Sequence, residues 1–179
     1  ETGKNIKVSQ ETVNLIVERA RGDRGNLNNE LQKLEALNLT RKKITQEDIF
    51  NLTNLSEDYG IFELVDNYLA KNKIKVSKIL NENNFVNDDC ILILRTLLNR
   101  SKRLLKLKNI QKEKDNIDEV ISSYKPSIFW KEKDLVKQQI KNWSEKEIKE
   151  KIYQISNLEI LTKKNTSSIN LVSDLISNY

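Results

Sequence analysis

The chain has 179 residues, of which 37% are hydrophobic and 32% are charged, with only four glycines and one proline. This composition favours a helical protein over an all-β one, and the length allows one domain or two small ones. The net charge of +5 permits a polyanionic partner without requiring one.

Two residue types exclude several kinds of chemistry. The sequence has one cysteine, Cys90, and no histidine, which rules out intrachain disulfides, zinc sites built from Cys and His, and His-based catalysis. The longest apolar run, Cys90 to Leu94, is far shorter than the roughly 20 residues that span a bilayer. We therefore expect a cytoplasmic protein that binds no metal or cofactor and does not enter a membrane.

The lack of any methionine predicts a piece of a larger protein, and the opening Glu-Thr-Gly is consistent with a cloning remnant.

Three short helices are predicted between residues 9 and 54. Ser9 is a plausible N-cap for the first, and Gly22 suits the left-handed position after its end. Asp23 can cap the second helix, which carries one apolar stripe of Leu27, Leu31 and Leu34. The stretch 45–48 is similar to a capping box and introduces the third.

Longer helices are predicted from residue 56 onward. Apolar spacing indicates one helix through Phe62, Val65 and Leu69 and a second through Ile74, Val76, Ile79 and Leu80. The longest helix is expected over about 88–114, with Asp88 and Asp89 at its start.

The last third of the chain predicts three more helices. After Pro126 comes a helix that includes Phe129, Leu135, Val136 and Ile140. Ser144 and Glu147 form a full capping box that opens a helix with Ile148, Ile152, Ile155 and Leu158 on one face. A final helix holds Ile169, Val172, Leu175 and Ile176. The prediction is an all-α protein with a small three-helix unit followed by a five- or six-helix bundle.

The stretch "GDRGNLNN", residues 22–29, raises the question of a phosphate-binding loop. A loop of the Walker type needs a lysine and a serine or threonine after its glycines, and this stretch has neither. A helix end followed by an N-cap explains the glycines more simply. Carboxylate pairs such as Asp88 with Asp89 fall at helix starts or on polar faces, and Cys90 is expected to be a buried structural thiol. No catalytic constellation is predicted.

A basic ridge is predicted on the longest helix. At about 100° per residue, its leucines cluster in one direction while basic residues point roughly the opposite way. This ridge is a candidate for contact with DNA phosphates. An ordinary solvated face opposite a core stripe is the alternative. The candidate phosphate contacts are Arg95, Lys102, Arg103 and Lys106.

Several stretches, in order, resemble one protein family. They are "GDRGNLNNELQKLEAL", "ITQEDIFNL", "IFELVDNYLAKN", "LILRTLLNRSKRLLKLK" and "KPSIFWKEKDLVKQQIKNWS". Together they are similar to the C-terminal part of the delta subunits of the bacterial DNA polymerase III clamp loader. The resemblance covers nearly all of residues 9–179. Its more specific parts are 28–34 and 129–143.

The resemblance implies an architecture and a set of partners. Residues 1–55 would be a helical lid of the AAA+ type and residues 56–179 a collar domain for oligomerisation. The partners would be the clamp-loader ATPase (gamma/tau) subunits and delta prime, in a bacterial cytoplasm. The sliding clamp would be contacted only by a domain preceding residue 1. Primed DNA, held inside the assembly, would be within reach of the basic ridge.

The same resemblance bears on residues 22–25. AAA+ ATPases place an arginine in a G-x-x-R pattern near the start of a lid helix, where it senses the γ-phosphate. In this sequence Gly25 occupies the arginine position and Arg24 comes one residue early, about 100° around the helix. This departure agrees with a module that does not hydrolyse ATP.

The resulting expectation is a non-enzymatic clamp-loader subunit in DNA replication. Large aromatic residues are the expected interface anchors, and burial in the bundle core is the alternative. These anchors are Phe129, Trp130, Trp143 and Tyr153. A stand-alone helical nucleic-acid-binding regulator is the competing hypothesis, and a helical enzyme is disfavoured by the missing histidine.

Overall fold

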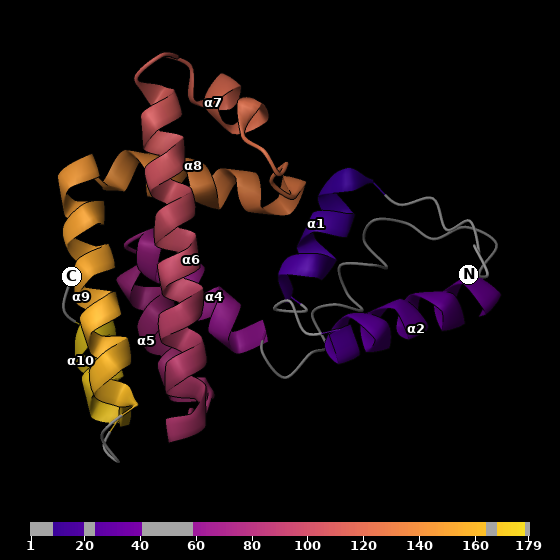
Figure 1. Ribbon diagram of the computed structural model, residues 1–179, viewed down its shortest axis with the longest axis horizontal. Coiled ribbons are helices and arrows are strands. Elements are labelled where there is room, and N and C mark those ends of the chain that lie inside the picture. The colour runs from indigo at the N-terminus through magenta and orange to yellow at the C-terminus, as the bar shows by residue number, and fades with distance from the viewer. Residues whose placement is uncertain (1–8, 20–23, 41–58, 164–167, 178–179) are drawn as a thin grey trace. The chain divides into compact units, whose positions relative to one another are not determined.

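The computed structural model describes residues 9–19, 24–40, 59–163 and 168–177. Every regular element in these ranges is a helix and none is a strand, which confirms the all-α fold class (Figure 1). No helix in the described ranges is both long enough and apolar enough to cross a membrane.

The chain divides into two compact units. One comprises residues 1–57 with 124–132, and the other comprises residues 58–123 with 133–179. The sequence predicted a division between residues 55 and 56 and placed 124–132 in the later unit. The structure divides the chain between 57 and 58 and groups 124–132 with the earlier residues. The assignment of these units as lid and collar stays a prediction.

In the first unit, α1 (Gln10–Arg19) packs against α2 (Arg24–Thr40). Ile16 and Leu34 are each only 3% exposed, whereas Leu31 of the predicted stripe is 47% exposed. The Asn14 side-chain amide donates a 3.3 Å hydrogen bond to the Ser127 carbonyl, which ties the segment 124–132 to α1. The predicted caps Gly22 and Asp23, the stretch 45–48 and the third short helix lie outside the described residues.

The second unit is built around α6. Its helices are α4 (Tyr59–Leu69), α5 (Lys73–Glu82), α6 (Asn87–Gln111), α7 (Ile117–Ser123), α8 (Lys133–Asn142), α9 (Glu145–Thr162) and α10 (Ser168–Ser177). Figure 1 shows α9 running alongside α6, and α6 also contacts α4, α7, α8 and α10. Leu94, Leu97, Leu104 and Leu107 of α6 are at most 1% exposed, so this helix supplies the centre of the core.

Three local predictions differ from the structure. The short α7 was not predicted, because its seven residues are too few for a clear apolar period. Phe129 precedes the 3₁₀ turn η1 (Trp130–Glu132) and does not belong to the α8 helix. Ile74, predicted as part of an apolar face, is 87% exposed, while Val76 and Ile79 supply the buried face of α5.

Candidate interaction surfaces

The four basic candidates on α6 have different environments. The Arg95 side chain is 59% exposed, and its Nε lies 3.1 Å from Glu159 Oε1 on α9. The Arg103 side chain is only 11% exposed, and its Nη2 lies 3.8 Å from Asp66 Oδ1 on α4. Lys102 and Lys106 are both exposed. Arg95 and Arg103 therefore connect α6 to neighbouring helices, and the two lysines are the candidates that face solvent.

Lys102 and Lys106 belong to one polar row along α6. The row also includes Asn99 and Asn109, and all four residues are exposed at spacings of three and four. Neither lysine forms an ion pair with any residue that the structure describes. Because they are four residues apart on one helix, the two lysines are separated by roughly 6 Å along the helix axis. The row can thus present two positive charges to a polyanion.

A buried charged cluster joins α6 to two other helices. Arg100 is 2% exposed, and its Nε lies 3.4 Å from Asp66 Oδ1. The Gln139 side chain from α8 donates a 3.0 Å hydrogen bond to the Asp66 carbonyl. Asp66 therefore links three helices, α4, α6 and α8, through one residue. Its surroundings indicate a role in holding the bundle together.

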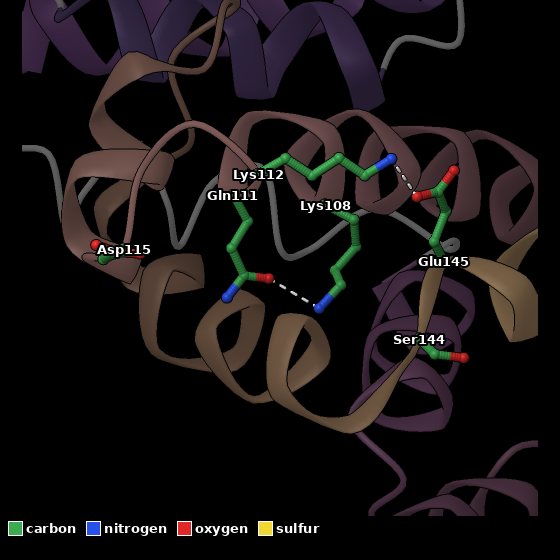
Figure 2. Close-up of a pocket in the computed structure, with 6 residues that line it drawn as sticks. All are labelled: Lys108, Gln111, Lys112, Asp115, Ser144 and Glu145. Carbon is green, nitrogen blue, oxygen red and sulfur yellow. Dashed lines mark hydrogen bonds and ion pairs between the residues drawn. The ribbon is translucent and has the colours of Figure 1, made fainter.

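A surface depression of about 470 Å³ lies between the end of α6 and the start of α9 (Figure 2). Lys108 Nζ donates to Gln111 Oε1 at 2.8 Å and to the Ile140 carbonyl at 3.2 Å. Glu145 forms ion pairs with Lys112 and Lys149, and these contacts, Lys112 first, lower the pKa of its carboxyl group to about 2. The basic groups of the depression are thus committed to contacts within the chain.

The four aromatic candidates fall into two groups. Phe129 and Trp143 are 2% and 5% exposed, so their side chains are buried within the fold. Trp130 and Tyr153 are 47% and 70% exposed. Only the second pair is accessible to a partner, and Tyr153 lies on α9 of the bundle unit.

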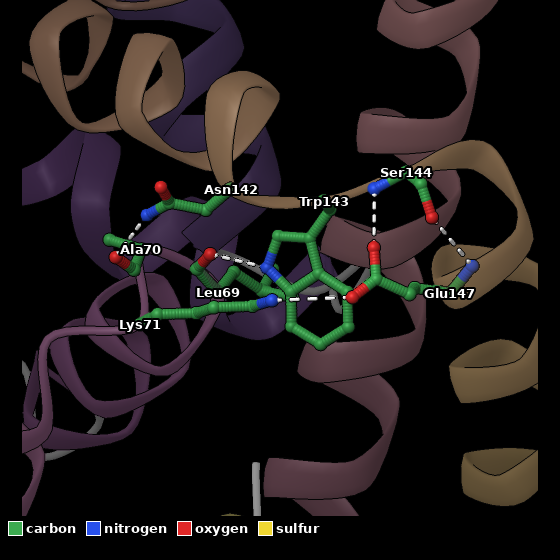
Figure 3. A network of polar contacts seen from close by, with 7 residues as sticks. All are labelled: Leu69, Ala70, Lys71, Asn142, Trp143, Ser144 and Glu147. Atoms are coloured by element: carbon green, nitrogen blue, oxygen red, sulfur yellow. Dashed lines mark hydrogen bonds and ion pairs between the residues drawn. The ribbon is translucent and has the colours of Figure 1, made fainter.

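The position of Trp143 follows from how α4 ends. The last carbonyls of a helix have no partner within the helix. Trp143 Nε1 donates to the Leu69 carbonyl at 2.6 Å, and Asn142 Nδ2 donates to the Ala70 carbonyl at 2.7 Å (Figure 3). The end of α8 and the residue after it therefore cap the end of α4.

Lys71 completes this junction in an unusual backbone conformation. Its φ of 54° lies in the left-handed region, and its N–H donates to the Tyr68 carbonyl while Asn72 N–H donates to the Asn67 carbonyl. This pair of bonds defines a Schellman motif, whose left-handed position is usually glycine. Lys71 Nζ lies 4.5 Å from the centre of the Trp143 ring and 3.4 Å from Glu147 Oε1.

The predicted capping box at α9 is confirmed. The Ser144 hydroxyl accepts from the Glu147 N–H at 3.2 Å, and the Glu147 carboxylate accepts from the Ser144 N–H at 2.7 Å (Figure 3). The hydrogen bonds from Ser144, with a smaller contribution from Lys71, lower the pKa of Glu147 to about 2.

A smaller pocket of about 280 Å³ lies between α5, α6 and α10. Its lining is mostly apolar and includes Phe85, Ile93 and Val172, together with Cys90. Cys90 is 1% exposed, and its thiol donates to the Val86 carbonyl at 3.6 Å. Burial, and then the charge of Asp89, raises the pKa of this thiol, which lowers its reactivity.

One exposed apolar surface was missed by the sequence analysis. On α9, Ile160 and Leu161 are 55% and 46% exposed and lie two turns beyond Tyr153. The sequence did carry a signal for this surface. Tyr153 and Ile160 are seven residues apart and therefore share one face of α9, opposite the core residues Ile148 and Ile155.

No protein-family model matches this sequence, and comparison with curated proteins and with solved structures gives no match either. Within the described ranges, no group of three or more His, Cys, Asp or Glu residues is placed to hold a metal ion.

Proposed function

We propose that this chain is a non-catalytic subunit of a bacterial DNA polymerase III clamp loader that assembles with the ATPase subunits and supports clamp loading on primed DNA. The observation that carries the proposal is the order and spacing of the sequence stretches that resemble delta subunits. The division into a small helical unit and a larger helical bundle supports it.

In this proposal the chain acts by binding the other clamp-loader subunits. Trp130 and Tyr153 are the anchors, because they are the aromatic candidates with large exposed fractions. Phe129 and Trp143 act indirectly by stabilising the fold. The lid would pass the ATP-driven movements of neighbouring subunits to the domain that opens the clamp.

The test of assembly is size-exclusion chromatography with light scattering. The full chain is mixed with the ATPase subunit and delta prime of a bacterial clamp loader. A stable mixed complex that weakens at least tenfold in the Trp130→Ala or Tyr153→Ala variant supports the proposal. Ile74→Ala is the matched control, because Ile74 is 87% exposed on α5. No complex at micromolar concentrations contradicts the proposal.

Contact with primed DNA is the second part of the proposed function. Lys102 and Lys106 would follow phosphates along the exposed row of α6, whereas Arg103 is occupied beside Asp66. Loss of two phosphate contacts should weaken DNA binding and reduce the slope of log affinity against log salt by roughly two. The variant is Lys102→Glu with Lys106→Glu, measured by fluorescence anisotropy on a primed template.

A matched double variant controls for net charge. Lys78→Glu with Lys141→Glu makes the same charge change at exposed positions on α5 and α8. It should lower affinity only slightly and leave the salt slope near that of the unaltered chain. An equal effect of the two double variants would exclude the α6 row as the contact.

The exposed lysines also favour one competing function, a stand-alone nucleic-acid-binding regulator. Such a protein binds nucleic acid alone, through Lys102 and Lys106, and needs no loader subunit. Salt-sensitive binding to DNA or RNA without any complex in the chromatography experiment would select this function.

A further inference from the structure

Lys151 on α9 is a partly buried lysine that forms no ion pair with any residue the structure describes. Its Nζ lies 5.9 Å from the centre of the Tyr68 ring, and Tyr68 is fully buried. Lys149 on the same helix is instead paired, with its Nζ 2.6 Å from Glu145 Oε1. The positive charge of Lys151 therefore lies against the fold without a counter-charge.

The spacing of residues on α9 explains why Lys151 lacks a partner. Side chains on a helix pair with residues three or four positions away, and Glu147 is the one acidic residue at these distances from Lys151. One oxygen of the Glu147 carboxylate accepts from the Ser144 N–H at 2.7 Å, and the other lies 3.4 Å from Lys71 Nζ (Figure 3). The capping box and Lys71 thus occupy the carboxylate that α9 offers to Lys151.

The helices around α9 do not supply a carboxylate either. Helix α6, which packs along α9, has no acidic residue between positions 90 and 112. The two acidic residues of α4 are committed, since Glu63 pairs with Lys75 and Asp66 lies beside the arginines of α6. Asp174 of α10 forms no ion pair within the described ranges. The charge that acts on Lys151 is the positive charge of Lys71.

Lys71 and Lys151 belong to one cluster, but their surroundings differ. Lys71 Nζ lies 4.5 Å from the centre of the Trp143 ring and close to Glu147, and both contacts stabilise a positive charge. The Tyr68 ring lies near the outer limit of about 6 Å for such an attraction to Lys151. Burial, and then the charge of Lys71, lowers the pKa of Lys151. Lys151 is therefore more often a neutral amine than an ordinary lysine is.

We propose that Lys151 is an acyl-acceptor site, whose ε-amine attacks the carbonyl carbon of a small acyl phosphate while the Lys71 ammonium contacts the phosphate of the donor. A lysine that is desolvated and lies next to another cationic group is an activated nucleophile. An acyl phosphate suits this cluster better than a neutral donor, because hydrogen bonds between an ammonium and a phosphate are charge-assisted. The acyl group is small, because Lys151 is partly buried.

The reaction needs no other reactant. The amine nitrogen forms a bond to the acyl carbon, the bond from that carbon to the phosphate oxygen breaks, and inorganic phosphate leaves with the electron pair. The amine gives up a proton to water, and the product is a neutral N-acyl-lysine. Acylation thereby removes the repulsion between Lys151 and Lys71. This site goes beyond the proposed function and does not depend on it.

The first test is acetylation of the full chain by acetyl phosphate at about pH 7.5, quantified for each lysine by mass spectrometry at low conversion. A pKa lower by one unit raises the neutral fraction about tenfold at this pH, and the lower basicity offsets part of that gain. Lys151 should therefore react at least about threefold faster than Lys149. The chain unfolded in guanidinium chloride is the control and should lose this preference. Equal rates in the folded chain, or a preference that survives unfolding, overturn the proposal.

The role of Lys71 is tested by comparing acetyl phosphate with a neutral acetyl ester. Lys71→Met should slow acetylation of Lys151 by both reagents, and more strongly by acetyl phosphate. Lys71→Arg keeps the charge and should react like the unaltered chain. Lys78→Met makes the same change at an exposed lysine on α5 and should have no effect. Equal slowing by the two reagents overturns the phosphate contact, and no slowing by either overturns the cluster.

The pH profile of labelling by the neutral ester tests the state of the amine. The rate at Lys151 should reach half its plateau at a lower pH in the folded chain than in the unfolded chain, because burial and Lys71 disfavour the ammonium. Lys71→Met should move the folded profile toward higher pH. Coincident profiles in the folded and unfolded chains overturn the proposal.

Discussion

The indole N–H of Trp143 donates a 2.6 Å hydrogen bond to the backbone carbonyl of Leu69, the last residue of α4. A residue that the sequence offered as an interface anchor thus caps a helix inside the bundle. Its aromatic ring lies 6.3 Å from that of Tyr68, which is fully buried. The contact joins the end of α4 to the connection between α8 and α9.

Trp143→Phe should destabilise the fold because it keeps most of the apolar contact but leaves the Leu69 carbonyl without its donor. The expected loss in the free energy of unfolding is about 1–3 kcal/mol. Urea unfolding followed by circular dichroism measures this loss. Trp130→Phe, at a 47% exposed position, is the control and should change stability by less than about 0.5 kcal/mol. Equal losses in the two variants would contradict the capping role.

At position 71 a glycine variant should be more stable than an alanine variant, which is the reverse of the usual order within helices. Both substitutions remove the same side-chain contacts, but alanine at a φ of 54° retains the strain of the left-handed conformation. Lys71→Gly should therefore be about 1 kcal/mol more stable than Lys71→Ala. At Lys78, which is exposed within α5, the alanine variant should be more stable than the glycine variant by about 0.5–1 kcal/mol. The same order at both positions would contradict the Schellman assignment.

The Asp66–Arg100 pair should be costly to break. Asp66→Asn leaves Arg100, which is 2% exposed, without the carboxylate charge beside it. Breaking a buried pair from one side typically costs about 3–5 kcal/mol. Combining Asp66→Asn with Arg100→Met should recover much of this loss, and calorimetry or urea unfolding would show it. As a surface comparison, Glu82→Gln removes the exposed pair with Lys78 and should cost less than about 0.5 kcal/mol.

Acid should weaken the α9 capping box in a defined pH range. The pKa of Glu147 is about 2 in the folded chain against an ordinary value of 4.5. A group whose folded pKa is lowered stabilises the fold above its unfolded pKa, and this stabilisation is lost as protons bind. The contribution of Glu147 is therefore complete above about pH 4.5 and declines as the pH falls toward 2.

Glu147→Gln should remove that part of the pH dependence. The variant should be less stable than the unaltered chain at pH 7, and the difference should shrink as the pH falls toward 2. Urea unfolding at a series of pH values gives the comparison. Glu150→Gln is the control on the same helix, since Glu150 contacts Lys146 only at 4.0 Å. A difference that does not change with pH would exclude the carboxylate charge as the cause.

Local signals in the sequence predicted the elements well. The limits of α6 lie within three residues of those expected, because a long leucine period and an acidic first turn mark it clearly. The Ser144–Glu147 capping box was also predicted correctly, since its residues are close in the chain. The short α7 gave too little periodicity to be recognised.

The environment of individual side chains depended on distant residues. Arg103 was predicted to face outward with Lys102, but its side chain is only 11% exposed and its Nη2 lies 3.8 Å from Oδ1 of Asp66, 37 positions earlier. Trp143 is 5% exposed, and its indole donor is satisfied by a carbonyl 74 positions away. Periodicity gives the direction in which a side chain points from its own helix. It does not show which other helix packs against that side chain or which polar group the side chain contacts.

The grouping of residues 124–132 with the first unit means that the chain passes between the two units three times. A single cut near residue 57 would therefore not give two independent fragments. The C-terminal piece would carry nine residues that belong with the other unit, and the N-terminal piece would lack them. Isolating the bundle requires replacing 124–132 by a short linker between Ser123 and Lys133, and isolating the smaller unit requires supplying that segment as a separate peptide.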